Sequence, residues 1–301
     1  MLSAIEKLLD TANQIILGKN RQLRLALCCL FAKGHLLIED VPGVGKTTLA
    51  HTLAKLLGLE YQRIQFTSDI LPADIIGSSI FNAENHQFVF HPGPIFKQMI
   101  LADEINRATP KAQSALLEAM EERQISVEGN TYTLPEPFFV IATQNPSHQL
   151  GTYPLPESQL DRFLMRIELG YPDYKAEREL LTGIKRYLLI EKLETQLSPP
   201  QLEVIQQKIT EIYASDALLD YLQALIDFTR SSEDFPIGLS PRASLALLTA
   251  AKAWAFTEQR DSVIPEDIQA VFPAVAGHRL QPGQSDSQAI VAPILHQVKI
   301  P

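Results

Sequence analysis

The 301-residue sequence contains only two cysteines, Cys28 and Cys29, and they are adjacent. A disulfide between neighbouring residues would be strained, so the surrounding LALCCLFA segment predicts two core side chains on one buried helix. The seven histidines are scattered. They form no HExxH pattern, and the cysteines lack the paired spacing of a zinc site, so we expect no zinc centre.

Long apolar runs are also missing. No segment approaches the ~20 apolar residues needed to cross a bilayer. The N-terminal stretch MLSAIEKLLDTANQI is amphipathic and acidic, unlike a signal or transit peptide. We therefore expect a cytoplasmic protein with no membrane partner.

Basic residues are outnumbered, with 26 Lys and Arg against 35 Asp and Glu and a formal net charge of −9. This balance argues against a surface devoted to wrapping nucleic acid, although a local basic channel could exist within an acidic total. Nucleic acid is therefore not the expected partner.

The order of segments predicts two domains. Residues 1–195 alternate between helix and strand, which is typical of an α/β core with a parallel sheet between helices. Residues 196–301 read as helix after helix, forming a smaller all-α domain, with residues 172–195 as a helical bridge before it. Five short runs are the predicted strands: His35–Glu39, Tyr61–Phe66, Gln98–Ala102, Phe138–Thr143 and Phe163–Leu169.

Two further segments predict β-hairpins outside this sheet. Ser78–His91 carries Phe81, Phe88 and Phe90 on its arms and has a polar Asn-Ala-Glu-Asn turn. Gln124–Leu134 is predicted to turn at Gly129–Asn130.

The stretch EDVPGVGKTTLAHTLAKLLG follows the first predicted strand and resembles a phosphate-binding loop, with Asp40 where that motif expects glycine. Backbone amides of the loop and the positive end of the following helix would cradle phosphate oxygens. Lys46 would reach the β- and γ-phosphates, and the Thr47 hydroxyl would bind Mg2+. The predicted nucleotide-binding residues are Gly43, Val44, Gly45, Lys46, Thr47 and Thr48.

Asp40 lies at the entrance of this loop. Aspartate tolerates left-handed backbone angles, and its carboxylate need only point away from the phosphates. A Gly-rich turn that merely links a strand to a helix is the alternative, but the complete GVGKT ending and its place after a strand favour nucleotide binding.

The run QMILADE is an apolar strand that ends in two carboxylates, Asp103 and Glu104. In α/β nucleotide-binding folds, ligands lie at the carboxyl ends of strands. Asp103 is predicted to hold Mg2+ through its water shell, while Glu104 faces the γ-phosphate and polarises the attacking water. Considered without the phosphate loop, the two carboxylates could equally well belong to an exposed acidic turn. Together with the phosphate loop, they predict an ATP-hydrolysing centre.

These features, in this order, resemble the AAA+ ATPases and specifically the MoxR family. The resemblance spans residues 15–275 and implies a five-stranded AAA+ P-loop core with a helical lid. The strings that carry it are EDVPGVGKTTLA, DILPADIIG, HPGPIF, LADEINRATPKAQSALLEAMEERQ, VIATQNP, LPESQLDRFLMR and GLSPRASLALLTAAKAWA.

Further site residues follow from the resemblance. Asn145 is similar to sensor 1, which orients the attacking water. Arg162 is similar to an arginine finger that reaches the nucleotide of a neighbouring subunit, with Arg107 and Arg166 as competitors for that role. Arg242 is similar to sensor 2, which reaches the γ-phosphate of its own subunit.

The local sequence also bears on the roles implied for Arg242 and for the adenine pocket. Arg242 falls at a helix start, where the dipole disfavours a cation, so a triphosphate or an acidic side chain should lie nearby. Residues 15–18, with Ile16 and Gly18, would line the adenine pocket, although apolar residues before a helix often belong only to the core.

The resemblance also implies a ring, commonly a hexamer, with shared active sites, and hairpins that face a pore or partner. MoxR-like ATPases mature other proteins, often with partners that carry von Willebrand factor A domains. We therefore expect Mg2+-dependent ATP hydrolysis that drives chaperone-like remodelling of protein complexes. One alternative is an ATP-dependent nucleic-acid motor of the related helicase clade, and another is a nucleotide-gated scaffold with negligible turnover. The hairpin tips contain no Lys or Arg to contact phosphates, which argues against the motor.

Overall fold

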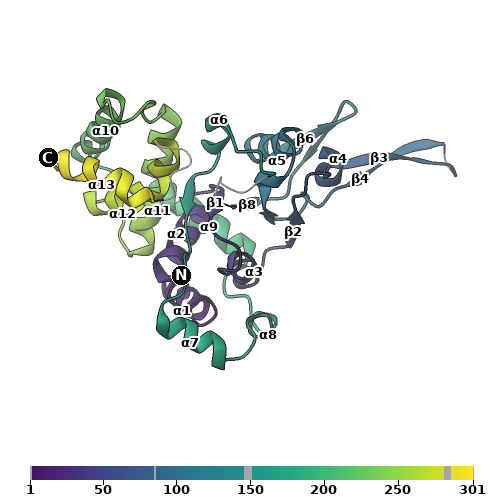
Figure 1. Cartoon of the computed structure of the whole chain (residues 1–301), viewed down its shortest axis with the longest axis horizontal. Coiled ribbons are helices and arrows are strands. Elements are labelled where there is room, and N and C mark those ends of the chain that lie inside the picture. Colours follow the sequence, from purple (N-terminus) through teal and green to yellow (C-terminus); the bar gives the residue numbers. More distant parts are fainter. Residues whose placement is uncertain (1, 85, 146–150, 281–285, 301) are drawn as a thin grey trace.

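The computed structural model describes residues 2–84, 86–145, 151–280 and 286–300 (Figure 1). Its centre is a parallel five-stranded sheet with strand order β2-β5-β8-β1-β9. The strands are β1 (Leu36–Glu39), β2 (Tyr61–Gln65), β5 (Met99–Asp103), β8 (Phe139–Gln144) and β9 (Met165–Ile167). All five predicted strands are present: four agree within one residue at each end, and the last is two residues shorter at both ends.

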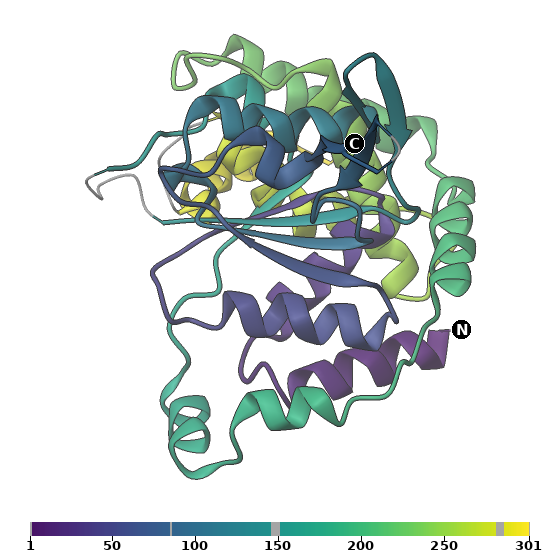
Figure 2. The ribbon, with the colours of Figure 1, turned by 90° about the vertical axis from the view of Figure 1, so that its right-hand side faces the viewer.

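Helices cover both faces of the sheet (Figure 2). Alternate residues of each buried strand point to opposite faces, so Leu36 and Ile38 join one core cluster while Leu37 joins the other. The first cluster packs beneath α1 (Leu2–Asn13), α2 (Asn20–Phe31) and α3 (Lys46–Leu56). The second packs against α4 (Pro72–Ile76) and α5 (Pro110–Glu122).

The C-terminal part of the chain is helical, as predicted. It follows a bridge of two helices, α7 (Tyr174–Thr182) and α8 (Arg186–Glu191). In the preceding α/β part, a short helix η1 (Ile105–Arg107) follows β5, and a short helix α6 (Glu157–Leu160) precedes β9. The helical part comprises α9 (Pro199–Glu211), α10 (Asp216–Ser231), α11 (Pro241–Thr257), α12 (Pro265–Leu280) and α13 (Ser287–Gln297).

One apolar core runs through both parts of the chain. The first cluster contains β-strand residues such as Ile141, helix residues such as Leu27 and lid residues such as Leu247 and Phe272. Gln206 of α9 also donates a hydrogen bond to the backbone oxygen of Leu30 at 2.9 Å. The predicted division at residue 195 lies between α8 and α9 and does not separate two cores.

Both predicted hairpins form, and each is a sheet of its own. The first, β3 (Gly77–Asn82) paired with β4 (Gln87–Pro92), projects from the body of the molecule (Figure 1). The second pairs β6 (Gln124–Val127) with β7 (Asn130–Thr133). Its turn is Glu128–Gly129, with φ of 51° and 81°, rather than the predicted Gly129–Asn130, because Asn130 already pairs with Val127.

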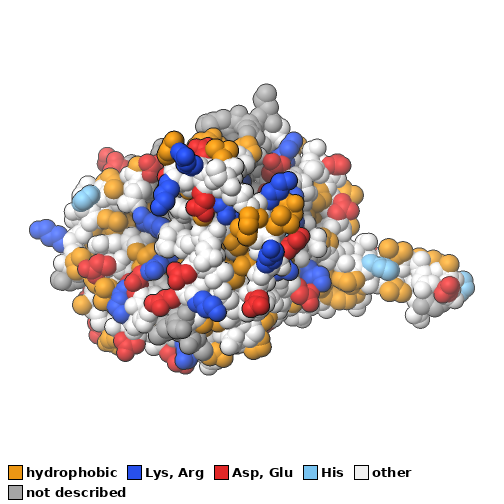
Figure 3. All heavy atoms as spheres, turned by 90° about the horizontal axis from the view of Figure 1, so that it is seen from below, with side chains coloured by type: hydrophobic (Ala, Val, Ile, Leu, Met, Phe, Trp, Pro, Cys, Tyr) orange, Lys and Arg blue, Asp and Glu red, His pale blue; other side chains and the backbone are white. Residues whose placement is uncertain are grey.

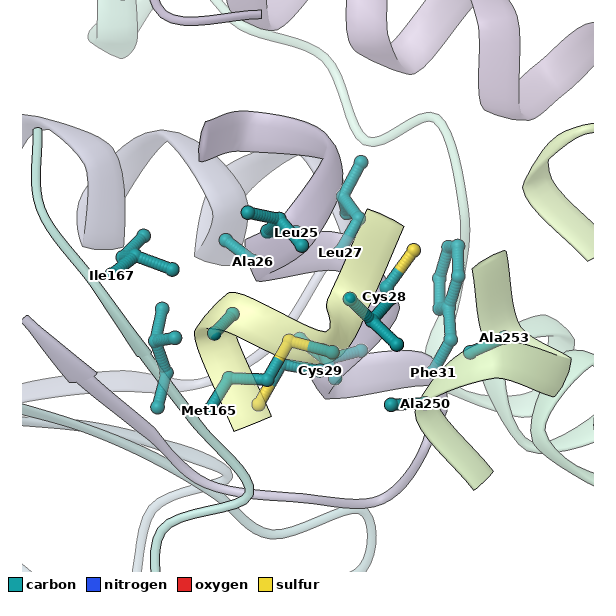
Figure 4. Close-up of a cluster of buried hydrophobic side chains, with 14 of the residues drawn as sticks. Leu25, Ala26, Leu27, Cys28, Cys29, Phe31, Met165, Ile167, Ala250 and Ala253 are labelled. Carbon is teal, nitrogen blue, oxygen red and sulfur yellow. The ribbon is translucent and has the colours of Figure 1, made fainter. Parts of the chain in front are cut away.

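The two cysteines are buried core residues of α2, as predicted (Figure 4). They face different neighbours: Cys28 Sγ lies 3.8 Å from the Thr257 hydroxyl in the lid, and Cys29 lies beside Met165 of β9. Burial raises the pKa of Cys28 to about 12, so this thiol is unreactive at neutral pH. Across the described ranges, no helix is long and apolar enough to cross a membrane, and no group of three or more His, Cys, Asp or Glu side chains is arranged around a metal position.

Candidate active site at the carboxyl edge of the sheet

The phosphate loop joins β1 to α3, and its two glycines have left-handed backbones, with φ of 88° at Gly43 and 100° at Gly45. A Cβ atom at either position would meet nothing within 4 Å, so the space in front of the loop is open. Helix α3 begins at Lys46 with no side-chain cap on its first amides. A triphosphate fits this arrangement, because anionic oxygens would bind those amides and the positive helix end.

Asp40 has a structural role that its position in the motif did not reveal. Its Oδ2 accepts hydrogen bonds from the backbone N–H of Leu169 at 2.7 Å and of Gly170 at 2.6 Å, and its Oδ1 accepts one from Val41 N–H at 2.8 Å. The carboxylate therefore points away from the phosphate cradle, as predicted. Asp40 has no positive φ, so the loop entrance does not require the left-handed backbone that aspartate tolerates.

Lys46 is buried at the centre of the loop. Its Nζ donates to the backbone oxygen of Asp40 at 2.6 Å and to Asn145 Oδ1 at 3.5 Å. Burial lowers the pKa of Lys46, while the neighbouring carboxylates of Asp40, Asp103 and Glu104 oppose that shift. The ammonium group thus lies between the loop and the acid pair, where a γ-phosphate would bridge them.

Asp103 ends β5 and is almost fully buried. Its Oδ1 accepts from the Thr143 hydroxyl at 2.6 Å, and its Oδ2 accepts from Arg63 Nη2 at 2.6 Å. The Thr143 hydroxyl also accepts the backbone N–H of Glu104 at 2.8 Å. Thr143 and Arg63 are site residues that the sequence analysis missed, because they lie 40 residues from Asp103 along the chain.

Glu104 follows β5 in a left-handed conformation, with φ 57° and ψ 48°. Its Oε1 accepts from Asn145 Nδ2 at 3.1 Å, while its Oε2 accepts from Arg107 and from Gln65, each at 3.1 Å. A non-glycine residue held at positive φ by its surroundings is typical of functional sites. The structure therefore brings the predicted acid, the predicted sensor 1 and the loop lysine together.

The predicted adenine-pocket residues lie along a segment that reaches the phosphate loop. Ile16 is buried, and Gly18, at φ 68°, packs against Asp173 and Ala176 at the start of α7. Lys19 Nζ donates to the Tyr171 backbone oxygen at 2.7 Å. Since Gly170 in turn binds Asp40, this strip is continuous with the loop.

The two remaining predicted arginines lie elsewhere, at the amino-terminal edge of the sheet. Glu121 Oε2 lies 3.0 Å from Arg162 Nη1, and Glu121 Oε1 accepts from Arg242 Nη2. They line a pocket of about 280 Å3 whose wall includes Gly34 and His35, just before β1. An acidic side chain therefore offsets the unfavourable helix position of Arg242.

This placement corrects the expectation for Arg242. Lys46 follows the carboxyl end of β1, whereas Arg242 lies by the residues that precede β1, so the sheet separates it from the phosphate loop of its own subunit. In this arrangement Arg242 cannot act on its own subunit's γ-phosphate. It shares a surface with Arg162 instead.

The competitors of Arg162 have other positions. Arg166 is buried in β9 and forms an ion pair with Glu39 at 2.9 Å, so it cannot reach another subunit. Arg107 lies at the acid pair of its own subunit, bound to Glu104. Of the three candidates, Arg162 alone lies away from that acid pair with a partly exposed side chain, although its Nη1 also donates to the Leu117 backbone oxygen at 2.6 Å.

Comparisons with known proteins agree with this fold. Residues 35–165 match the model of the ATPase family associated with various cellular activities (AAA), and residues 227–294 match the AAA lid domain. A solved structure of a putative ATPase from Cytophaga hutchinsonii superposes with a TM-score of 0.88 at 36% identity, covering 100% of this chain and 96% of that one. Fold, loop and acid pair therefore define an AAA ATPase.

Relatives that match over most of their length identify the family within the AAA ATPases. The uncharacterized protein YeaC of Bacillus subtilis is 45% identical over 98% of this chain and 94% of its own length. Chaperone MoxR1 of Mycobacterium tuberculosis is 41% identical, covering 92% of this chain and 75% of that protein. Protein MoxR of Methylorubrum extorquens is 33% identical, covering 93% and 89%. The chain belongs to the MoxR family.

Proposed function

We propose that this ATPase works as a hexameric ring of identical subunits that hydrolyses ATP with Mg2+ and remodels protein complexes in the cytoplasm. The observation that carries the proposal is the separation of Arg162 and Arg242 from the phosphate loop of their own chain. Arginines in these roles must reach a phosphate. A neighbouring subunit would supply one.

The roles within one subunit follow from the contacts. Thr47 and Asp103 would hold Mg2+, which would neutralise phosphate charge. Asn145 orients the Glu104 carboxylate through its Nδ2, and Glu104 would accept a proton from the attacking water. Lys46 would bind the β- and γ-phosphates from the buried end of the loop.

The projecting β3–β4 hairpin supports a protein client. Phe81 and Phe88 pair on one face of this ribbon and Ile80 and Val89 on the other, and all four are exposed. The hairpin contains no Lys or Arg, and hydrophobic side chains lie along its visible face beside histidine and one acidic side chain (Figure 3). Apolar side chains without cations suit a polypeptide better than a phosphate backbone.

The name of the M. tuberculosis relative, a chaperone, points in the same direction. Partners with von Willebrand factor A domains are part of this proposal. A nucleic-acid motor remains the second candidate, favoured only by the hairpins that it shares with helicases of the related clade.

The deciding experiment measures ATP hydrolysis against protein concentration, with Mg2+, in the presence and absence of single-stranded and duplex DNA. A specific activity that rises with concentration and ignores DNA is expected. Strong stimulation by DNA would support the motor, and a rate independent of concentration would remove the support for shared sites.

A further inference from the structure

One carboxylate contacts both arginines that the ring would share. We propose that Glu121 is a positioning residue: it holds Arg162 of the core and Arg242 of the lid side by side, so that both reach the nucleotide of one neighbouring copy. The inference rests on the proposed function. It adds a residue from α5 that contacts no nucleotide itself.

The charges explain why an acid is needed at this point. Two guanidinium groups side by side repel each other, and Arg242 also lies in the first turn of α11, where the helix dipole disfavours a cation. Each Glu121 oxygen faces one arginine, with Oε2 3.0 Å from Arg162 Nη1 and Oε1 bound to Arg242 Nη2. An ion pair with Arg162 and a charge-assisted hydrogen bond with Arg242 offset both costs.

The geometry leaves both arginines able to bind a further anion. Each contact with Glu121 uses one terminal nitrogen of a guanidinium that carries five N–H donors. The side chains are 28% exposed for Arg162 and 51% exposed for Arg242. Arg162 Nε is buried, so the donors left for an approaching triphosphate are those of Arg162 Nη2 and of Arg242 Nε and Nη1.

A second acidic residue, Asp161, holds the lid against the core next to Arg162. Asp161, which precedes Arg162, accepts from Arg279 Nε at 2.6 Å and from the Ser240 hydroxyl at 3.3 Å. Arg279 is buried and belongs to α12, whereas Ser240 caps α11 through the Ala243 N–H. The Asp161 contacts hold the lid helices against the core, and Glu121 then sets the spacing of the two arginines.

The first test is Glu121→Gln. Glutamine keeps the shape and one acceptor oxygen, but its amide nitrogen cannot accept from the second arginine. We expect kcat for ATP to fall roughly 10-fold to 100-fold, because a displaced catalytic group costs about that much. The affinity of an isolated subunit for a fluorescent ATP analogue should not change, because the sheet separates Glu121 from the loop that binds it. A protein that was merely unstable would lose binding and thermal stability together.

Glu122→Gln is the matched control, since it removes the same charge from the next, exposed residue of α5. It should leave kcat near the wild-type value. A Glu121→Gln rate equal to that of Glu122→Gln would overturn the inference.

Mixed rings provide the second test. Glu121→Gln subunits have an intact acid pair, so mixing them with Glu104→Gln subunits should restore hydrolysis, whereas mixing them with Arg162→Ala subunits should not. Absence of rescue with Glu104→Gln, when Arg162→Ala is rescued by the same partner, would overturn the role of Glu121. A wild-type rate that does not depend on concentration would instead overturn the shared-site proposal, and the two failures are therefore distinguishable.

Discussion

The carboxylate of Asp40 binds the backbone N–H of Gly170 at 2.6 Å, which joins the entrance of the phosphate loop to the end of β9. The same oxygen binds the N–H of the buried Leu169. Asp40 is therefore a structural link between two loops at the nucleotide site.

Asp40→Gly would restore the common form of the phosphate-loop motif, yet we expect it to weaken the protein. It leaves three N–H groups without their acceptor, at about 1–3 kcal/mol for a buried one. Chemical denaturation should show the lost stability, and titration with an ATP analogue should show weaker binding. Asp220→Gly changes an exposed aspartate of α10 and controls for the lost charge; equal stability of the two variants would contradict this role.

Glu104→Gln should keep ATP binding and lose turnover by roughly 10²-fold or more, because an amide cannot accept the proton of the attacking water. The glutamine oxygen can still accept from Asn145, so the local structure should persist. Binding and single-turnover hydrolysis measured on the same sample separate the two effects. Hydrolysis near the wild-type rate would exclude Glu104 as the base.

Arg162→Ala should abolish hydrolysis without loss of ATP binding, because Arg162 is separated from its own phosphate loop. Mixing Arg162→Ala with Glu104→Gln subunits should restore activity, since each subunit supplies the half-site that the other lacks. Subunit exchange must be shown by a labelled chain. Failure of rescue despite exchange would place Arg162 outside the shared site.

Arg63→Gln should lower the Mg2+ concentration that gives half-maximal nucleotide binding, by roughly tenfold. The Arg63 guanidinium binds Asp103 Oδ2 through two nitrogens, at 2.6 and 3.1 Å, and a cation on that oxygen competes with a metal. Metal titration of fluorescent-nucleotide binding measures this without turnover. Lys97→Gln is the control, because it removes a cation that pairs with Glu60 instead. An unchanged or higher Mg2+ requirement for Arg63→Gln would refute the competition between Arg63 and the metal for Asp103.

His35 makes stability depend on pH. Val140 N–H donates to its Nδ1 at 3.0 Å, and burial lowers its pKa from 6.5 to about 4. The unfolded chain therefore binds a proton more readily, so the stabilisation is complete above pH 6.5 and is lost as the pH falls toward 4. That loss amounts to about 3 kcal/mol.

His35→Gln removes the titrating ring while keeping a donor and an acceptor. Its free energy of unfolding should fall less steeply from pH 6.5 to 4 than that of the wild type, in urea titrations at several pH values. His278, whose pKa burial also lowers, supplies a remaining slope in the same direction. His296→Gln, which replaces an exposed histidine of α13, is the matched control. Identical slopes for all three proteins would contradict the assignment.

The sequence predicted the features that depend on neighbours along the chain. Apolar runs marked the strands, and the glycines marked the loop after β1. Contacts between distant segments were not predictable, since Glu121 meets an arginine 121 positions away. The last strand is shorter than predicted partly because the Leu169 N–H binds the Asp40 side chain rather than another strand. The position of Arg242 away from its own phosphate loop was not predicted, because no local sequence pattern states where a lid packs.

The single core shared by sheet and lid has a mechanical consequence. Leu247 and Phe272 of the lid belong to the same buried cluster as Ile141 of the sheet, so swinging the lid away would expose apolar surface at considerable cost. The α/β core and the lid of each chain should then move together as one rigid body. Force from hydrolysis would be carried across the boundaries between neighbouring chains, and no hinge within the polypeptide would be required.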